Sequence, residues 1–163
     1  MASIEYNTDT LDPALAAVAA AVSDMTPVMD AIGELLLVSA QDRMRNGEQP
    51  DGAPFAPRKQ STLDRYAKLG LTFGAPLNVS DDMRNTLFYE ADEDSVEYGS
   101  NAIQAAVMQF GAAKGAFGKA SNDSSIPWGT IPARPFIGLS DEDQDNIVAD
   151  LEDWLEEAAT HRD

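Results

Sequence analysis

The sequence predicts an α+β fold in which long N-terminal and C-terminal helices pack on a small antiparallel sheet, with extended loops. Three features lead to this expectation. Apolar residues recur at helical spacing near both ends, two short aromatic-rich stretches flank an acidic turn in the middle, and proline- and glycine-rich segments separate these elements. No internal repeat or second core is visible in the 163 residues, so we expect a single domain over residues 1–163.

The first helix is predicted from an apolar stripe behind Asp12 and Pro13, a pair typical of a helix start. The stripe consists of Leu11, Leu15, Val18 and Val22. Pro27 removes a backbone donor and should break or kink the helix, which makes residues 1–27 an acidic N-terminal helical arm. A second helix is expected from Val28 to about Arg45, with Gly47 in its C-terminal cap.

The middle of the chain alternates short elements with loops. Residues 47–58 contain three prolines and two glycines and should form a loop, whereas Gln60 to Leu69 suits a short helix. A further short helix is expected from Ser80 to Leu87. Residues 88–92 and 95–99 are predicted to form a β-hairpin with an acidic turn. Asn101 is expected to cap a helix that runs to Gln109.

The C-terminal part begins with residues 111–125, which we interpret as a mobile loop. Three prolines should keep residues 126–136 extended, as in an edge strand. Ser140 and Asp143 then resemble a capping box at the start of a long helix. Its expected apolar face comprises Ile147, Leu151, Trp154, Leu155 and Ala158.

The chain is strongly acidic, with 28 acidic and 11 basic residues and a formal net charge of −17. Residues 1–40 and 141–163 carry −15 of this charge, so the middle is nearly balanced. Such a charge disfavours binding to a DNA backbone, which needs clustered Lys and Arg. No apolar stretch is long enough for a bilayer and the N-terminus lacks a basic signal region, so we expect a soluble cytoplasmic protein without membrane contact.

Candidate catalytic groups are few. The chain has no cysteine, and its one histidine, His161, is expected to be a solvated tail residue. Asp92, Glu93 and Asp94 are better explained as a charged turn than as a metal site or a hydrolase pair. The glycine-rich residues 111–119 end Gly-Lys-Ala and follow a predicted helix, unlike a phosphate-binding loop. We therefore expect no enzyme activity, metal or cofactor.

Several blocks, taken in order, resemble the phage virion morphogenesis family of Mu-like phages, whose members are described as tail completion or neck proteins. The most specific block is Ile-Pro-Ala-Arg-Pro-Phe-Ile-Gly-Leu-Ser at residues 131–140. It is preceded by Met-Gln-Phe-Gly at 108–111, where the family usually has His-Gln-Phe-Gly, and by a Pro-Asp-Gly loop at 50–57. The resemblance covers residues 28–158.

The resemblance, with the character of these blocks, suggests interaction residues rather than catalytic ones. Pro132 and Pro135 bracket Arg134 in a stiff segment, and the Arg134 guanidinium should bind a carboxylate of its own chain or of a neighbour. Phe110 and Phe136 are expected in the core. The full candidate set is Gln109, Phe110, Gly111, Lys114, Phe117, Lys119, Trp128, Pro132, Arg134, Pro135 and Phe136.

The resemblance implies a structural virion protein that acts in tail completion or head–tail joining at the neck. It implies a homo-oligomeric ring, with six copies expected, that meets neck, connector or tail-tube proteins in a virion assembled in the host cytoplasm. DNA could pass through such a ring without specific binding. A tail terminator or connector protein is the alternative within this class, and an acidic DNA mimic that inhibits a DNA-binding protein is the alternative outside it.

Overall fold

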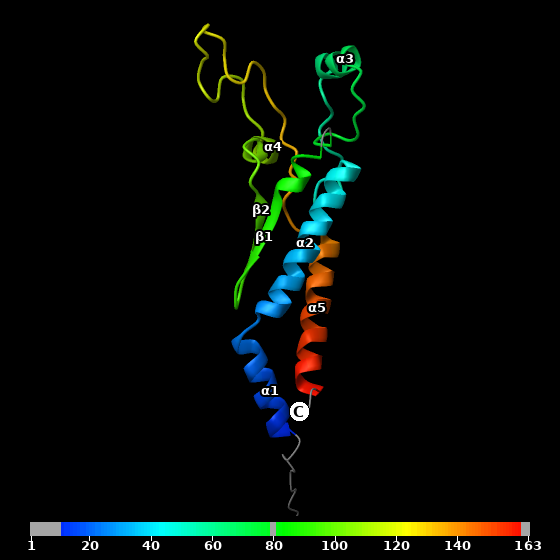
Figure 1. The fold of residues 1–163 in the computed structure, drawn as a ribbon, viewed down its shortest axis with the longest axis vertical. Coiled ribbons are helices and arrows are strands. Elements are labelled where there is room, and N and C mark those ends of the chain that lie inside the picture. The colour runs from blue at the N-terminus through cyan, green and yellow to red at the C-terminus, as the bar shows by residue number, and fades with distance from the viewer. Residues whose placement is uncertain (1–10, 79–80, 161–163) are drawn as a thin grey trace, which may run out of the picture.

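The computed structural model describes residues 11–78 and 81–160, and His161 therefore lies outside the described residues. The described chain is elongated (Figure 1). One half holds α1 (Leu11–Ser23), α2 (Thr26–Asn46), α5 (Asp141–Thr160) and a two-stranded antiparallel sheet. The opposite end holds α3 (Gln60–Lys68), α4 (Ala105–Phe110) and the long loops (Figure 1). The predicted α+β class, with helices packed on a small antiparallel sheet, is confirmed.

Helix α2 forms the centre of the core because its apolar residues repeat every four residues and face the sheet and α5. Val28, Ile32 and Leu36 pack in one apolar cluster with Ile147, Leu151 and Trp154 of α5. Ala40 and Met44 belong to a second cluster around the fully buried Phe136. A Cβ added to Gly33 would lie 2.2 Å from the Tyr89 ring, so the helix and the sheet touch closely at that glycine.

The predicted break between the first two helices is confirmed. Helix α1 ends at Ser23, α2 starts at Thr26 with Pro27 in its first turn, and the two axes meet at 56°. Helix α1 packs against α5, yet Leu11, Leu15 and Val22 of its apolar stripe remain exposed. Among the described residues no single helix is long and apolar enough to cross a membrane, and the bent pair α1–α2 meets that criterion only when both helices are counted together.

The hairpin is also confirmed. Strand β1 (Leu87–Ala91) pairs antiparallel with β2 (Val96–Ser100), with Leu87 opposite Ser100. Two boundaries were predicted wrongly. The helix expected up to Leu87 is only a 3-10 turn, η1 (Arg84–Thr86), because the strand already begins at Leu87. Asn101 does not cap α4, since its N–H donates to the Thr86 carbonyl and continues the hairpin, and α4 begins four residues later.

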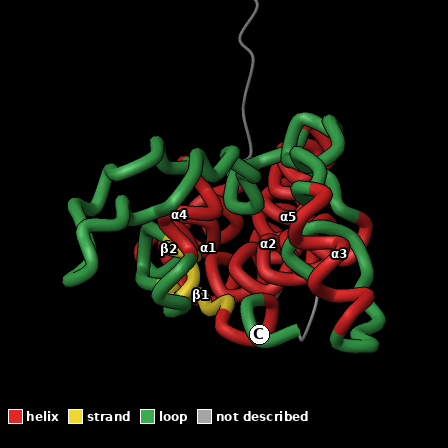
Figure 2. Tube along the Cα trace, turned by 90° about the horizontal axis from the view of Figure 1, so that it is seen from above, coloured by secondary structure: helices red, strands yellow, loops and turns green. Residues whose placement is uncertain are grey.

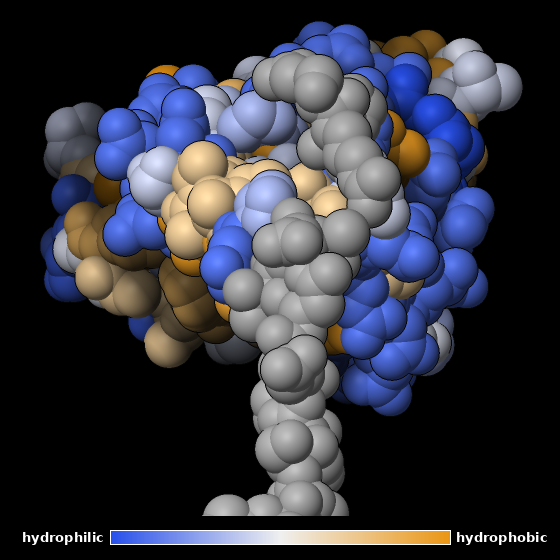
Figure 3. Space-filling model, turned by 90° about the horizontal axis from the view of Figure 1, so that it is seen from below, coloured by the Kyte–Doolittle hydropathy of each residue, from blue (hydrophilic) through white to orange (hydrophobic). Residues whose placement is uncertain are grey.

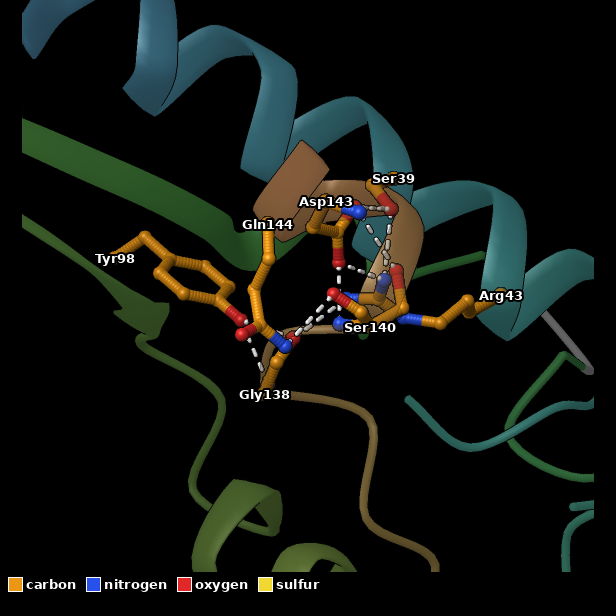
Figure 4. A network of polar contacts seen from close by, with 7 residues as sticks. All are labelled: Ser39, Arg43, Tyr98, Gly138, Ser140, Asp143 and Gln144. Atoms are coloured by element: carbon orange, nitrogen blue, oxygen red, sulfur yellow. Dashed lines mark hydrogen bonds and ion pairs between the residues drawn. The ribbon is translucent and has the colours of Figure 1, made fainter. Parts of the chain in front are cut away.

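The start of α5 is fixed by the predicted capping box and by a buried ion pair (Figure 4). The Asp143 N–H donates to Ser140 Oγ at 3.0 Å, and the Ser140 N–H donates to Asp143 Oδ2 at 2.8 Å. Arg43 of α2 donates to the same carboxylate oxygen at 2.6 Å and to the Gly138 carbonyl at 2.9 Å. This network joins α2, α5 and the turn that leads out of the proline-rich segment.

The ionisation of Asp143 follows from these contacts. Burial acts to raise the pKa of its carboxyl, but hydrogen bonds from Ser140, Ser39 and Arg43 outweigh burial, and the net pKa lies below its ordinary value. Tyr98 completes the support of the turn, because its hydroxyl donates to the Gly138 carbonyl and accepts from the Gly138 N–H. Burial raises the pKa of Tyr98, so this hydroxyl keeps its proton.

Candidate interaction site

A cleft of about 550 Å³ opens between α3 with its flanking loops and residues 127–134. Three of its lining residues are cations, Arg58, Lys59 and Arg134, and none is acidic. The rest of the lining is largely apolar. It includes Tyr66, Leu77, Met83, Met108 and Ile131. In a protein with a net charge of −17, a cleft with three cations and no acid is the most distinctive electrostatic feature of the described residues.

Arg58 is held on one wall by neutral groups. Its guanidinium donates to the carbonyls of Gly74 at 2.7 Å and Ala75 at 2.5 Å. It also lies over the rings of Phe73 and Tyr66, with 5.0 and 5.8 Å from the guanidinium carbon to the ring centroids. These contacts fix the position of the charge without neutralising it, because a carbonyl dipole or a ring face attracts a cation but supplies no negative charge.

Arg134 occupies the base of the cleft and is buried. Its Nε donates to the Ala56 carbonyl at 2.7 Å and its Nη2 to the Pro57 carbonyl at 3.0 Å. Within the described chain the Arg134 guanidinium therefore binds backbone carbonyls and no carboxylate, and its fork joins the proline-rich segment to the loop at residues 50–57. Burial, with a smaller contribution from nearby Arg58, lowers the pKa of Arg134, in keeping with two positive groups at one site.

Gln109 is a structural clamp for the same segment. Its Nε2 donates to the Ile137 carbonyl at 2.8 Å, while its Oε1 accepts from the N–H groups of Phe136 at 3.0 Å and Ile137 at 3.1 Å. Phe136 is fully buried, as predicted. Gly111 has φ +72°, and an added Cβ would lie 2.8 Å from Ala133 N and Ile131 O. The Gln-Phe-Gly block thus supports the Pro-Ala-Arg-Pro-Phe block.

Residues 111–131 form an arm that projects from the rest of the molecule (Figures 1 and 2). The arm doubles back on itself, because Ala112 and Ile131 exchange two backbone hydrogen bonds of 2.9 and 2.8 Å, and Phe117 N–H donates to Ile126 O at 2.8 Å. Lys114 and Lys119 lie on this arm, and Lys119 pairs with Asp123 at 2.7 Å. The mobility of residues 111–125 stays a prediction.

Aromatic side chains on and beside the arm point to solvent. Phe110 is 79% exposed, Phe117 57% and Trp128 80%. The prediction that Phe110 lies in the core was wrong. It is the last residue of a six-residue helix that buries only Ala105, so its ring falls beyond the core. Pro132 lines the cleft and Pro135 lies on the opposite side of the segment, near Leu139.

Sequence reasoning missed the buried ion pair of Arg43 and Asp143, although Asp143 was placed in the capping box, and it missed Arg58 and Lys59 as cleft residues. The first two carried a usable signal. Arg43 lies seven residues after Leu36 and Asp143 lies four residues before Ile147, so each continues an apolar face and becomes buried. Arg58 and Lys59 carried none, because only the three-dimensional fold places them opposite Arg134.

The residues that the structure describes include no group of three or more His, Asp or Glu side chains placed to hold a metal ion. Asp143, the one buried carboxylate among the described residues, is committed to its ion pair with Arg43. Charge is also divided unevenly between the two ends of the molecule. The loop lobe, which we define as residues 47–78 and 101–137, has seven basic and four acidic residues, whereas the remainder has four basic and 24 acidic residues.

Comparison with known proteins identifies the family of the chain. The model of the phage virion morphogenesis family matches residues 6–156. The chain belongs to the phage virion morphogenesis family. A curated relative is the Mu-like prophage FluMu G protein 2 of Haemophilus influenzae, with 26% identity over 157 residues, which span 96% of this chain and 97% of the relative. No solved structure matches the chain. The family membership gives this member a role in phage virion morphogenesis and confirms the resemblance in the sequence.

Proposed function

We propose that this protein is a non-enzymatic component of the phage neck, which completes the tail or joins head to tail as a homo-oligomeric ring. The observation that carries the proposal is the exposed aromatic surface on and beside the projecting arm of residues 111–131. Phe110, Phe117 and Trp128 are each more than half exposed beside a segment whose path is fixed by Arg134 and Gln109. Exposed aromatic residues on a prepared surface are typical of protein–protein contacts.

The prepared surface favours assembly for a physical reason. Side chains and backbone that are already ordered lose little entropy on docking, so more of the contact energy appears as affinity. The prolines and the clamps by Arg134 and Gln109 supply this order before any partner arrives. A ring in which one patch meets a different patch of the next copy would leave both ends of the ring free for other neck proteins.

Two measurements test the proposal. Light scattering and electron microscopy of the purified protein should show rings, with six copies expected, and virions should contain the protein at the neck. Deleting its gene from an inducible prophage should yield heads and tails that fail to join. Infectious particles that lack the protein, or full particles in which it occurs only away from the head–tail junction, would overturn the proposal.

A further inference from the structure

We propose that the cationic cleft receives the exposed apolar and acidic stripe of α5 from a second copy of this chain, in a head-to-tail contact. The inference rests on the proposed ring and names the surfaces that build it. We define the stripe as Val148, Glu152, Leu155 and Glu156, four exposed residues of α5 that lie beside the buried face with Ile147 and Trp154.

The cleft presents positive charge for which the described chain supplies no ion-pair partner. Arg58 and Arg134 donate their hydrogen bonds to backbone carbonyls. Lys59 is exposed, and its Nζ lies close to Gly129 across the cleft. None of the ion pairs among the described residues includes any of these three cations. Carboxylates entering the cleft would therefore meet cations already held in place, which is the arrangement that strengthens charge-assisted hydrogen bonds.

The stripe combines exposed apolar and acidic side chains. Val148 is 53% exposed, and Leu155, which was expected on the apolar face of this helix, is 36% exposed. Glu152 and Glu156 are exposed between and beside them, and neither pairs with a basic residue of the described chain. Apolar and acidic groups together match a cleft whose walls are apolar and whose charges are positive.

Net charge is divided unequally between the loop lobe and the rest of the chain. The loop lobe carries a net +3 and the rest of the chain a net −20, so opposite ends of two copies attract while like ends repel. The cleft lies at the end with α3 and the arm, whereas the stripe lies on α5 in the other half (Figure 1). One copy therefore presents the two surfaces at separate places, and a contact between them is heterologous. Such a contact generates a ring when its rotation closes.

The end that carries α1 shows why the stripe, and not that end, is assigned to the cleft. Viewed from below, pale and orange apolar surface lies beside blue hydrophilic surface (Figure 3). The exposed α1 residues Leu11, Leu15 and Val22 provide apolar surface on that helix, where Asp12 is the single carboxylate. Docked in the cleft, α1 would bring one carboxylate to three cations and leave the others desolvated and unpaired, which costs free energy, whereas the stripe brings two.

The test blocks each surface by charge reversal in the full-length protein. Lys59→Glu alters the cleft without touching the bonds of Arg58 or Arg134, and Glu152→Lys with Glu156→Lys alters the stripe. Each variant should weaken self-association by about tenfold or more, because Lys59→Glu lowers the charge of the cleft from +3 to +1 and the stripe variant places two lysines against Arg58 and Arg134. The matched controls are Lys68→Glu at the exposed end of α3 and Glu142→Lys with Asp153→Lys elsewhere on α5, which should associate like the wild type.

Mixing the two blocked variants gives the decisive readout. The Lys59→Glu copy keeps an intact stripe and the other copy keeps an intact cleft, so the mixture should form 1:1 dimers that cannot extend or close, measured by light scattering. Rings that persist in both blocked variants would overturn this inference and leave the proposed ring standing. A wild-type protein that never self-associates, in solution or in virions, would overturn both. Duplex DNA that binds the wild type and not Lys59→Glu would assign the cleft to DNA and also overturn the inference.

Discussion

The two ends of this molecule are stabilised in different ways. The helical body, formed by α1, α2, α5 and the hairpin, is held by apolar packing around α2 and by one buried ion pair. The loop lobe has few buried side chains and is held by polar clamps in which Arg58, Arg134 and Gln109 bind backbone groups. The body is thus stabilised by an ordinary apolar core, whereas hydrogen bonds from polar side chains hold the loops of the lobe in place.

The comparison shows where stability and binding reside. The arm is held by backbone hydrogen bonds between its two limbs, which leave Phe117 and Trp128 exposed and available to a partner. The body offers few such groups, apart from the stripes on α1 and α5. We therefore expect changes in the body to act on folding, and changes on the lobe surface to act on assembly.

Asp143→Ala should lower the free energy of unfolding by about 3–5 kcal/mol, because it leaves the buried Arg43 guanidinium without its carboxylate. Chemical denaturation followed by circular dichroism measures this change. Asp42→Ala removes an exposed ion pair with Arg45 on the same helix and should cost no more than about 1 kcal/mol. Equal losses in the two variants would mean that the buried network does not anchor the body.

Gln109→Ala should cost about 2 kcal/mol, because it leaves the N–H groups of Phe136 and Ile137 and the Ile137 carbonyl without their side-chain partner. Thermal unfolding measures the loss. Gln104→Ala, a neutral control on the residue that precedes α4, should change stability little, since the side-chain hydrogen bonds to Phe136 and Ile137 come from Gln109 and not from Gln104. A Gln109→Ala protein as stable as the wild type would show that the clamp is dispensable to the lobe.

Stability should also fall in acid. The folded pKa of Asp143 lies below its unfolded value, so its contribution is fully present above about pH 4 and is lost as the pH falls through the folded pKa. Unfolding experiments between pH 6 and pH 2 should therefore show a smaller decline for Asp143→Asn than for the wild type. Identical pH profiles would show that another group causes the acid sensitivity.

Removing the exposed aromatics, in the triple variant Phe110→Ala, Phe117→Ala and Trp128→Ala, should change stability by no more than about 0.5 kcal/mol for each site. The same variant should fail to restore infectivity in a prophage that lacks the gene, because the lobe would lose its apolar contact surface. Complementation by plating, alongside denaturation, separates the two effects. Normal infectivity would remove these side chains from the interaction surface.

The smallest effect is expected at the hairpin turn. Asp92→Ala with Asp94→Ala removes two exposed carboxylates that have no assigned contact to a core group, and it should leave both folding and virion assembly unchanged. Denaturation and complementation together test this expectation. A loss of assembly with normal folding would point to a function of the acidic turn that neither the body nor the lobe explains.

The sequence predicted the body well because its signals are local. Apolar periodicity located α2 and α5, Pro27 located the break after α1, and the Ser140–Asp143 capping box located the start of α5. The hairpin followed from two aromatic-rich stretches of β-favouring residues on either side of an acidic turn. In each case the residues that determine the element lie within a few positions of one another.

The candidate site could be predicted only in part. The blocks at 108–111 and 131–140 were identified, but their roles depend on residues far apart in the chain. Arg134 binds carbonyls 77 and 78 positions away, and no local pattern indicates such a partner. The exposure of Phe110 was missed for the same reason, since only the path of the arm determines that its ring faces solvent.

The central claim is that this family member is an assembly protein whose copies join in a ring at the head–tail junction. Cryo-electron microscopy of intact virions, with the protein located by comparison with particles from the gene deletion, tests it most directly. The account predicts a ring of density at the neck that is missing from the deletion particles, whose heads and tails remain separate. Wild-type virions with no such ring, or deletion particles with normal necks, would contradict it.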